Sequence, residues 1–237
     1  MNLDNKTVLI VGGAMGIGLS TAELCAERGA HVIIADFNVA DGNRSAAKIG
    51  GEFYPINVAD ESSVKATFAQ IAQRHAKLDA LVQTAGVMKG SFVPLDELSV
   101  ETFKQTLDIN LVGSFLCAKH AAPLLRKGDK PVIVLLSSGA AVAGSSSYAY
   151  GASKGGVSSL GITLANKLAP EGIRVNTVLP GNIDTAMKRS VIQAEAERVG
   201  PQEQSQLNLG EPIGVARLLA FLVSDDADYV RGDIRTR

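Results

Sequence analysis

Residues 7–18 read Thr-Val-Leu-Ile-Val-Gly-Gly-Ala-Met-Gly-Ile-Gly. An apolar run of this length predicts a buried strand, and the residues after Gly16 have the pattern of a helix. The glycines between them permit a tight turn, let a bound group approach the backbone closely, and let helix and strand pack against each other. The stretch therefore predicts the strand, turn and helix that open a βαβ unit.

The rest of the chain repeats this alternation. Short apolar runs without polar alternation predict strands buried on both faces. Longer periodic segments between them predict helices, so the sequence indicates an α/β fold of the doubly wound (Rossmann) type, formed by a single domain over residues 1–237. The expected strands are 7–11, 31–35, 53–56, 78–82, 132–136 and 173–178, and the expected helices are 17–28, 40–49, 61–76, 99–127, 149–169 and 212–223.

Residues 186–210 form a polar insertion before the last expected helix. The insertion is too long for an ordinary loop in a compact domain. We expect it to act as a lid over a binding site.

Composition excludes several classes of protein. The 237 residues carry 23 Lys and Arg against 24 Asp and Glu, with no basic stripe, so nucleic acid is not an expected partner. The start of the chain has no signal-peptide pattern, and no run of 18 apolar residues occurs, which predicts a cytoplasmic protein without membrane association.

The cysteines and histidines give no sign of a disulfide or metal. Cys25 and Cys117 lie far apart in helix-like stretches, which favours packing roles. His31, His75 and His120 are scattered along the chain, without the spacing of a metal motif. The sequence therefore predicts no metal held by the protein.

An acidic residue at the end of the second expected strand narrows the choice of dinucleotide. Asp36 follows the glycine-rich turn by 18 residues, where a carboxylate can accept hydrogen bonds from the ribose hydroxyls of a dinucleotide and would repel a 2′-phosphate. No Arg or Lys lies in the turn or beside Asp36, which favours NAD over NADP. The expected cofactor-binding set is Gly12, Gly16, Ile17, Gly18, Asp36, Phe37, Asn57, Val58, Ala85 and Gly86.

Tyr150-Gly-Ala-Ser-Lys154 adds a device for proton transfer. The phenol and the ammonium are four positions apart on a helix, so both lie on one face. A cation beside a phenol favours the phenolate and lowers the phenol pKa from about 10. The pair alone is also compatible with an ordinary amphipathic helix, so its meaning depends on its context.

Taken together, the glycine spacing, Asp36, Ala85-Gly86 and the Tyr150/Lys154 pair resemble the short-chain dehydrogenase/reductase family over nearly the whole chain. The resemblance implies hydride transfer between NAD(H) and an alcohol or ketone. Carried over residue by residue, it makes Tyr150 the general acid/base, Ser138 the group that binds the substrate oxygen, and Asn110 the holder of a relay water. It makes Lys154 the ligand of the nicotinamide ribose, which also lowers the Tyr150 pKa.

The resemblance also implies nicotinamide contacts after the last long strand, from Pro180, Gly181, Ile183 and Thr185. Ser137 competes with Ser138, because Ser137 precedes Tyr150 by the 13 residues usual in the family. We favour Ser138, the second Ser closing the strand. A homodimer or homotetramer is a further implication, with a dimer through the helices at 99–127 and 149–169.

Four features depart from the family pattern. Val11, Asn57 and the pair Gln83-Thr84 replace the usual residues around the cofactor, and the chain stops at Arg237 where relatives continue. The first three alter the hydrogen bonds that brace the cofactor floor. The last predicts a shortened or differently paired final strand, which weakens the case for a tetramer.

Other functions remain open. Gly151-Ala-Ser-Lys-Gly155 matches the GxSxG motif of serine hydrolases, but all three histidines precede it, in the wrong order for that triad. A non-catalytic dinucleotide-sensing protein would keep the same fold. A lyase or epimerase would use the same residues without net redox turnover.

The sequence describes the substrate pocket only in outline. Met88, Val142 and Met187 are expected to line an apolar pocket, and Lys188-Arg189 offer a site for an anion or a solvated helix start.

Overall fold

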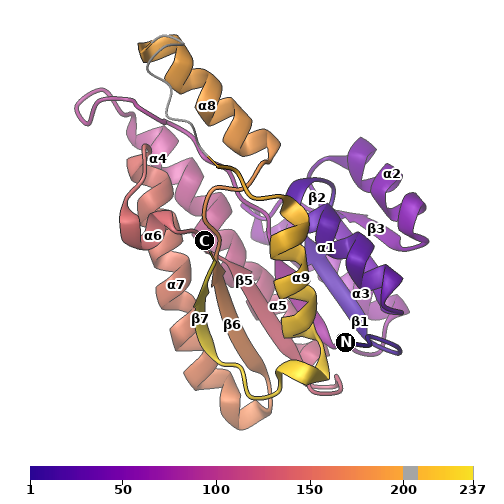
Figure 1. Cartoon of the computed structure of the whole chain (residues 1–237). Helices are drawn as coiled ribbons and strands as arrows, with labels where there is room; N and C mark the ends of the chain where they lie inside the picture. Colours follow the sequence, from indigo (N-terminus) through magenta and orange to yellow (C-terminus); the bar gives the residue numbers. More distant parts are fainter. Residues whose placement is uncertain (200–207, 237) are drawn as a thin grey trace.

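Seven parallel strands form one sheet in the computed structural model, which describes residues 1–199 and 208–236. The strand order is β3-β2-β1-β4-β5-β6-β7, so the chain reverses direction across the sheet between β1 and β4 (Figure 1). The strands are β1 (Thr7–Val11), β2 (His31–Asp36), β3 (Glu52–Pro55), β4 (Ala80–Gln83), β5 (Val132–Leu136), β6 (Arg174–Leu179) and β7 (Gly232–Arg235). In such a sheet, ligands bind beyond the carboxyl ends of the strands at the reversal point.

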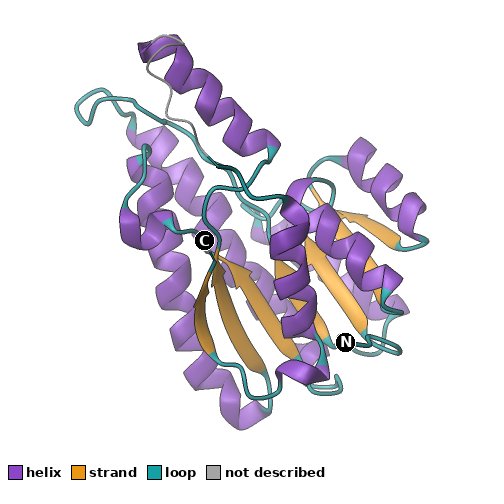
Figure 2. Ribbon diagram, in the orientation of Figure 1, coloured by secondary structure: helices purple, strands orange, loops and turns teal. Residues whose placement is uncertain are grey.

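Helices cover both faces of the sheet, as Figure 2 shows. One face packs on α1, α2 and α9, and the other on α3, α5 and α7. The helices are α1 (Gly16–Glu27), α2 (Val39–Ile49), α3 (Glu61–Arg74), α4 (Val100–Leu107), α5 (Gly113–Leu125), α6 (Ala140–Ala143), α7 (Tyr148–Leu168), α8 (Ala186–Val199) and α9 (Pro212–Val223). A π-helical turn spans Asp108–Val112, and short 3-10 helices span Ala169–Glu171 and Asp225–Ala227.

Burial on both faces explains why β1 and β5 are apolar over most or all of their length. In β1, Leu9 and Val11 join the core under α3 and α5, whereas Val8 and Ile10 join the core under α1 and α9. Side chains alternate between the faces of a strand, so both sets must be apolar when both faces are covered.

The expected doubly wound α/β fold is confirmed, and the six expected strands are present within two residues of their predicted bounds. The structure adds three elements. Residues 99–127 form two helices joined by the π-helical turn rather than one helix, a short helix α6 lies in the Ser/Gly/Ala loop, and Gly232–Arg235 pairs with β6 as a parallel final strand.

The expected lid is only partly described. Its first half is α8, which Figure 1 shows standing above the carboxyl edge of the sheet, and residues 200–207 lie outside the described residues. Ile183 and Gly210 form a parallel β-bridge, so both ends of the insertion meet.

Cys25 and Cys117 are free and buried, in agreement with packing roles. Among the helices that the structure describes, none has the length and apolar character needed to cross a membrane.

Candidate active site

A groove of about 1210 Å³ runs along the carboxyl edge of the sheet. This volume exceeds the roughly 300 to 1,000 Å³ usual for pockets that hold one small ligand. The groove therefore has room for a dinucleotide together with a substrate. Every cofactor-binding residue predicted from the sequence lines it: Gly12, Gly16, Ile17, Gly18, Asp36, Phe37, Asn57, Val58, Ala85, Gly86, Tyr150, Lys154, Pro180, Gly181, Ile183 and Thr185.

The glycine-rich turn brings bare backbone to the groove. Gly12 has a positive φ of 85°, and a Cβ there would collide with the backbone of Ala85. A Cβ on Gly18 would collide with the carbonyl oxygen of Gly12. Within the described residues, no side chain caps the start of α1, so its amide N–H groups remain available to an anion such as a pyrophosphate.

Asp36 connects the turn to the second strand. One carboxylate oxygen accepts a hydrogen bond from the Ala14 amide at 3.0 Å, and the other accepts one from the Asn38 amide at 2.9 Å. Each oxygen keeps a further lone pair for a ligand hydroxyl. Among the described residues of the groove wall, the cations are Lys89, Lys154 and Lys188, and none comes from the turn or from α2.

The residues that depart from the family pattern at the cofactor site, Val11, Gln83 and Thr84, differ in the hydrogen bonds they make. The Thr84 hydroxyl donates to the carbonyl oxygens of Val11 and Gly12, at 2.8 and 3.1 Å, so Thr84 braces the turn from β4. Gln83 is 1% exposed, and neither end of its amide has a hydrogen-bond partner among the described residues. The bracing therefore comes from Thr84 and not from its neighbour.

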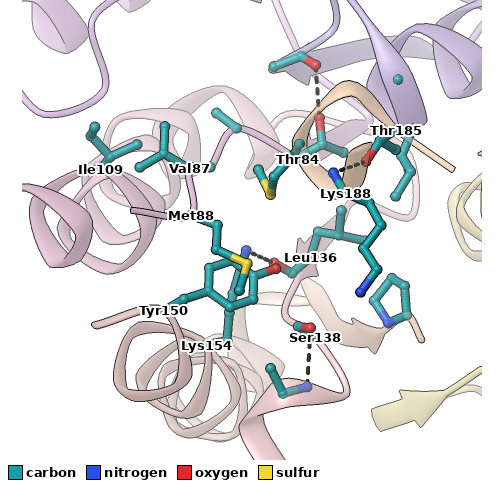
Figure 3. A pocket seen from close by; sticks show the side chains of 18 of the residues that line it. Thr84, Val87, Met88, Ile109, Leu136, Ser138, Tyr150, Lys154, Thr185 and Lys188 are labelled. Carbon is teal, nitrogen blue, oxygen red and sulfur yellow. Dashed lines mark hydrogen bonds between the residues drawn. The ribbon is translucent and has the colours of Figure 1, made fainter. Parts of the chain in front are cut away.

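Tyr150 and Lys154 lie one turn apart on α7 and face the groove (Figure 3). The Ser147 side chain caps this helix by accepting a hydrogen bond from the Tyr150 amide. Lys154 Nζ lies 5.7 Å from the centroid of the Tyr150 ring and donates a 2.7 Å hydrogen bond to the Leu136 carbonyl oxygen. The ammonium is thus held at the end of β5, beside the phenol ring.

Burial dominates the titration of both groups. It lowers the pKa of Lys154 to about 8. It raises the pKa of Tyr150, and the Ser138 hydroxyl opposes this rise only in part. Desolvation disfavours the phenolate more strongly than nearby groups favour it, so the net pKa of Tyr150 lies above its ordinary value. The expected lowering of this pKa by Lys154 stays a prediction. The phenol is protonated at neutral pH.

The two candidate serines do different things. Ser138 lines the groove and interacts with Tyr150 through its hydroxyl. Ser137 is 3% exposed, and its hydroxyl donates to the Lys154 carbonyl oxygen at 2.8 Å and accepts from Ser158 at 3.0 Å. Ser138 is the serine that shares the groove with Tyr150, and its hydroxyl accepts a 3.2 Å hydrogen bond from the Ala140 amide, while Ser137 ties β5 to α7.

Asn110 lies behind the groove wall and does not line it. It is fully buried in the π-helical turn, a feature that is frequent at functional sites. Its side-chain oxygen accepts from the Val87 amide at 2.8 Å, and its amide nitrogen donates to the Val87 carbonyl and the Ser153 hydroxyl, both at 2.9 Å. Asn110 thus connects the segment after β4 with α7. Sequence reasoning missed Ser153 in this network because its only signal is its place inside the Tyr150 motif.

The wall near the lid is only partly as expected. Thr185 accepts a hydrogen bond from the Lys188 amide at 3.2 Å, near the start of α8. Met88 and Met187 line the groove, but Val142 does not and is 54% exposed, because it lies on the outer side of α6. Lys188 reaches the groove, whereas the guanidinium of Arg189 pairs with Asp184.

A glycine-rich turn with free helix amides, an acidic strand end, and a Tyr/Lys/Ser cluster beyond it define a dinucleotide-binding oxidoreductase site. A family model described as "Enoyl-(Acyl carrier protein) reductase" matches residues 12–236. The chain belongs to the short-chain dehydrogenase/reductase family, whose members are oxidoreductases with nicotinamide dinucleotide cofactors.

Similar proteins of known name cover nearly the whole chain. Cis-4-hydroxycyclohexanecarboxylate dehydrogenase of Sinomonas cyclohexanicum is 36% identical over 97% of this chain and 93% of its own length. 2,5-Dichloro-2,5-cyclohexadiene-1,4-diol dehydrogenase of Sphingobium indicum is 34% identical over 98% of this chain and 94% of its own. Among solved structures, levodione reductase superposes with a TM-score of 0.89 at 28% identity, covering 99% of this chain and 96% of its own.

Proposed function

We propose that this protein is an NAD(H)-dependent dehydrogenase/reductase that interconverts a cyclic secondary alcohol and its ketone. The observation that carries the proposal is the convergence of Tyr150, Ser138 and Lys154 on one groove with the glycine-rich turn and Asp36. A non-catalytic dinucleotide-sensing protein would not need a phenol, a hydroxyl and a buried ammonium on the same wall of the groove.

The cofactor choice rests on Asp36. Its carboxylate lines the groove at the end of β2, and the lysines of the described groove wall come from segments after β4 or later. A 2′-phosphate there would face a carboxylate without a compensating cation, which costs free energy. NAD(H) carries hydroxyls at that position, and these can donate to the carboxylate.

In the proposed reaction, bound NADH supplies a hydride to the carbonyl carbon of the substrate. Tyr150 is protonated at neutral pH, so its hydroxyl donates a proton to the carbonyl oxygen as negative charge develops there. The Ser138 hydroxyl donates a second hydrogen bond to the same oxygen. In the reverse direction, the Tyr150 phenolate accepts the proton of the alcohol.

Lys154 and Asn110 position these groups. Lys154 Nζ is held by the Leu136 carbonyl and faces the ring of Tyr150, where its positive charge favours the phenolate formed after proton donation. Asn110 links Val87 to Ser153 on α7 and so fixes the helix that carries Tyr150. We therefore assign Asn110 a positioning role, and the relay water implied by the resemblance stays a prediction.

The substrate class rests on the groove and on the relatives. Met88 and Met187 give the wall an apolar character that suits a hydrocarbon ring. One relative is named for a cyclohexadiene diol and another for a hydroxycyclohexanecarboxylate, and one solved structure is named for levodione. We extend this ring preference to the present protein.

The test is an NAD-coupled assay over cyclohexanols, cyclohexanediols and 4-hydroxycyclohexanecarboxylate, with linear alcohols and sugars for comparison. We expect NADH formation with at least one ring alcohol and weaker turnover with linear ones. Tight NADH binding without turnover of any tested alcohol or ketone would instead support the dinucleotide-sensing or the lyase/epimerase reading.

A second test concerns the cofactor. We expect NADPH to bind at least about tenfold more weakly than NADH, a difference of roughly 1.4 kcal/mol, and Asp36→Ala to narrow this gap. Asp60→Ala is the matched control, because Asp60 is an exposed helix cap at the same edge of the sheet that does not line the groove. Tighter NADPH than NADH binding to the parent protein would refute the assignment.

A homo-oligomer through α5 and α7 remains part of the proposal. Phe115 on α5 is 45% exposed and Ile162 on α7 is 52% exposed, which favours burial of these helix faces against a second copy. A monomeric mass in solution would contradict it.

A further inference from the structure

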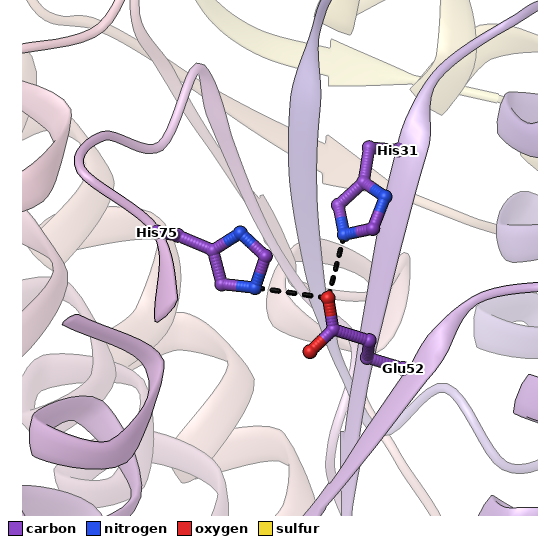
Figure 4. Close-up of side chains that lie close together, drawn as sticks. All are labelled: His31, Glu52 and His75. Carbon is purple, nitrogen blue, oxygen red and sulfur yellow. Dashed lines mark hydrogen bonds and ion pairs between the residues drawn. The ribbon is translucent and has the colours of Figure 1, made fainter. Parts of the chain in front are cut away.

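A second group of convergent side chains lies at the opposite edge of the sheet from the groove, at the starts of two strands. Figure 4 shows its three members, His31, Glu52 and His75. His31 is the first residue of β2, Glu52 is the first residue of β3, and His75 follows the last residue of α3. The carboxyl ends of the strands bound the groove, so residues at the strand starts are remote from the proposed chemistry.

The sheet register explains how distant residues meet. Glu52 is opposite Ile33, so His31, two residues earlier, projects from the same face of the sheet. That is the face covered by α3, whose end carries His75. Two histidines that are scattered in the sequence thus share one carboxylate.

The geometry of the three ligand atoms is tight. The Nε2 atoms of His31 and His75 lie 2.8 and 3.0 Å from the same Glu52 oxygen, Oε1, and all three atoms lie within 4.8 Å of one another. Nevertheless, His75 Nε2 is buried and has no hydrogen bond of acceptable geometry among the described residues. Its short distance to Glu52 therefore does not satisfy it as a donor or acceptor, and a buried polar atom in this state calls for a further partner.

Surrounding groups fix the carboxylate. The Tyr54 hydroxyl donates to the second oxygen, Oε2, at 3.0 Å, and Arg74 lies 3.6 Å from that oxygen with a largely exposed side chain. Burial pushes the Glu52 pKa upward, but hydrogen bonds from His31 and Tyr54, together with the nearby His75 ring, outweigh burial and leave the pKa below its usual value. Glu52 is therefore an anion at neutral pH, with Oε1 turned to the two imidazoles.

We propose that His31 Nε2, Glu52 Oε1 and His75 Nε2 form a Zn²⁺ site. Two imidazoles and one carboxylate are a ligand set that zinc takes in proteins. Tetrahedral zinc with bonds of about 2.0 to 2.2 Å holds its ligand atoms about 3.3 Å apart. The two distances from the Nε2 atoms to Glu52 Oε1, 2.8 and 3.0 Å, therefore need to open by only a few tenths of an ångström. The His31 side chain is 45% exposed, which leaves a solvent-facing position for a water as the fourth ligand.

Such an ion would connect the starts of β2 and β3 to the end of α3. It would stabilise the folded state, because the unfolded chain does not hold the three ligands together. This role is independent of the proposed function.

The experiment uses the full chain without a histidine tag, stripped of metal by a chelator and titrated with zinc chloride by calorimetry. At pH 7.5 we expect one equivalent to bind with a Kd on the order of 1 μM or tighter, and saturation at about a hundredfold excess over Kd to raise Tm by about 5 to 10 °C.

Variants assign the binding to the site. His31→Gln and His75→Gln should each weaken zinc binding at least about tenfold, as even outer partners of metal sites do when removed. His31→Gln is the decisive one, because its exposed side chain makes a folding defect unexpected. The matched control is His120→Gln: His120 also faces a carboxylate, Glu61 at 3.3 Å, but with Lys119 in place of a second imidazole.

Zinc binding that is absent at pH 7.5 would overturn the proposal and leave a simple His–Glu network. Binding that survives His31→Gln but is lost in His120→Gln would overturn it equally. Circular dichroism of each variant checks that the fold is kept.

Discussion

The burial of Lys154 in the active site should make the free energy of unfolding depend on pH, and replacing this lysine should remove that dependence. Lys154 is 4% exposed, and burial lowers its pKa from the ordinary 10.5 to about 8. At 1.36 kcal/mol for each pKa unit, this fall corresponds to about 3 kcal/mol. Below pH 8 the lysine is charged in both the folded and the unfolded chain. In that pH range its burial destabilises the folded protein by about 3 kcal/mol.

The sign of the effect follows from proton linkage. Between pH 8 and 10.5 the unfolded chain binds more protons at this site than the folded protein, so stability rises with pH. The Lys154→Met variant lacks this titration. Integrated between pH 7 and pH 10, the free energy of unfolding of the parent protein should rise by about 2.5 kcal/mol relative to Lys154→Met. Loss of the hydrogen bond to the Leu136 carbonyl adds an offset that is similar at both pH values.

The assay is guanidinium unfolding of both proteins at pH 7 and pH 10. Lys167→Met is the matched control, because Lys167 is an exposed lysine on the same helix. It should follow the parent protein at both pH values. The difference in free energy of unfolding between the parent protein and Lys154→Met could instead be the same at pH 7 and pH 10. That result would contradict a folded-state pKa of about 8 for Lys154.

Two further predictions concern the chemistry. Ser138→Ala should lower turnover by roughly 10² to 10³-fold, as expected for loss of one donor to a developing oxyanion, whereas Ser137→Ala should retain most of it because that hydroxyl bonds only to Lys154 and Ser158; the opposite ranking in steady-state kinetics would exchange their roles. Because burial raises the Tyr150 pKa, alcohol oxidation, which needs the phenolate, should keep rising between pH 7 and 9.5. Ketone reduction should stay level near pH 7 and change around pH 8, where Lys154 has lost about half of its charge. An oxidation profile that is flat above pH 7 would mean that the phenol pKa is lowered instead.

The sequence predicts the fold well because the central strands are buried on both faces. Residues 8–11 and 132–136 are apolar at every position, which is the pattern of a strand covered on both faces. The interruption of the helix at Asp108–Val112 was not predictable, since a π-helical turn is a change of hydrogen-bond register that needs no particular residue. The four-residue helix α6 lies in a Gly/Ala/Ser segment whose composition favours a loop.

The same limits apply to the sites. Sequence spacing places Tyr150 and Lys154 on one face of a helix, but it contains no information on desolvation, which raises the net pKa of Tyr150. His31, Glu52 and His75 come from three segments with one ligand each, so only the register of β2 and β3 and the end of α3 bring them together.

The most direct test of the proposed function is the Tyr150→Phe variant, which removes one hydroxyl and keeps the ring beside Lys154. We predict that NADH binds with nearly unchanged affinity by fluorescence titration. We also predict that turnover of the best ring alcohol falls by roughly 10² to 10⁴-fold, the usual contribution of a general acid/base. Turnover within a few-fold of the parent protein, with NADH still bound, would contradict Tyr150 as the proton donor.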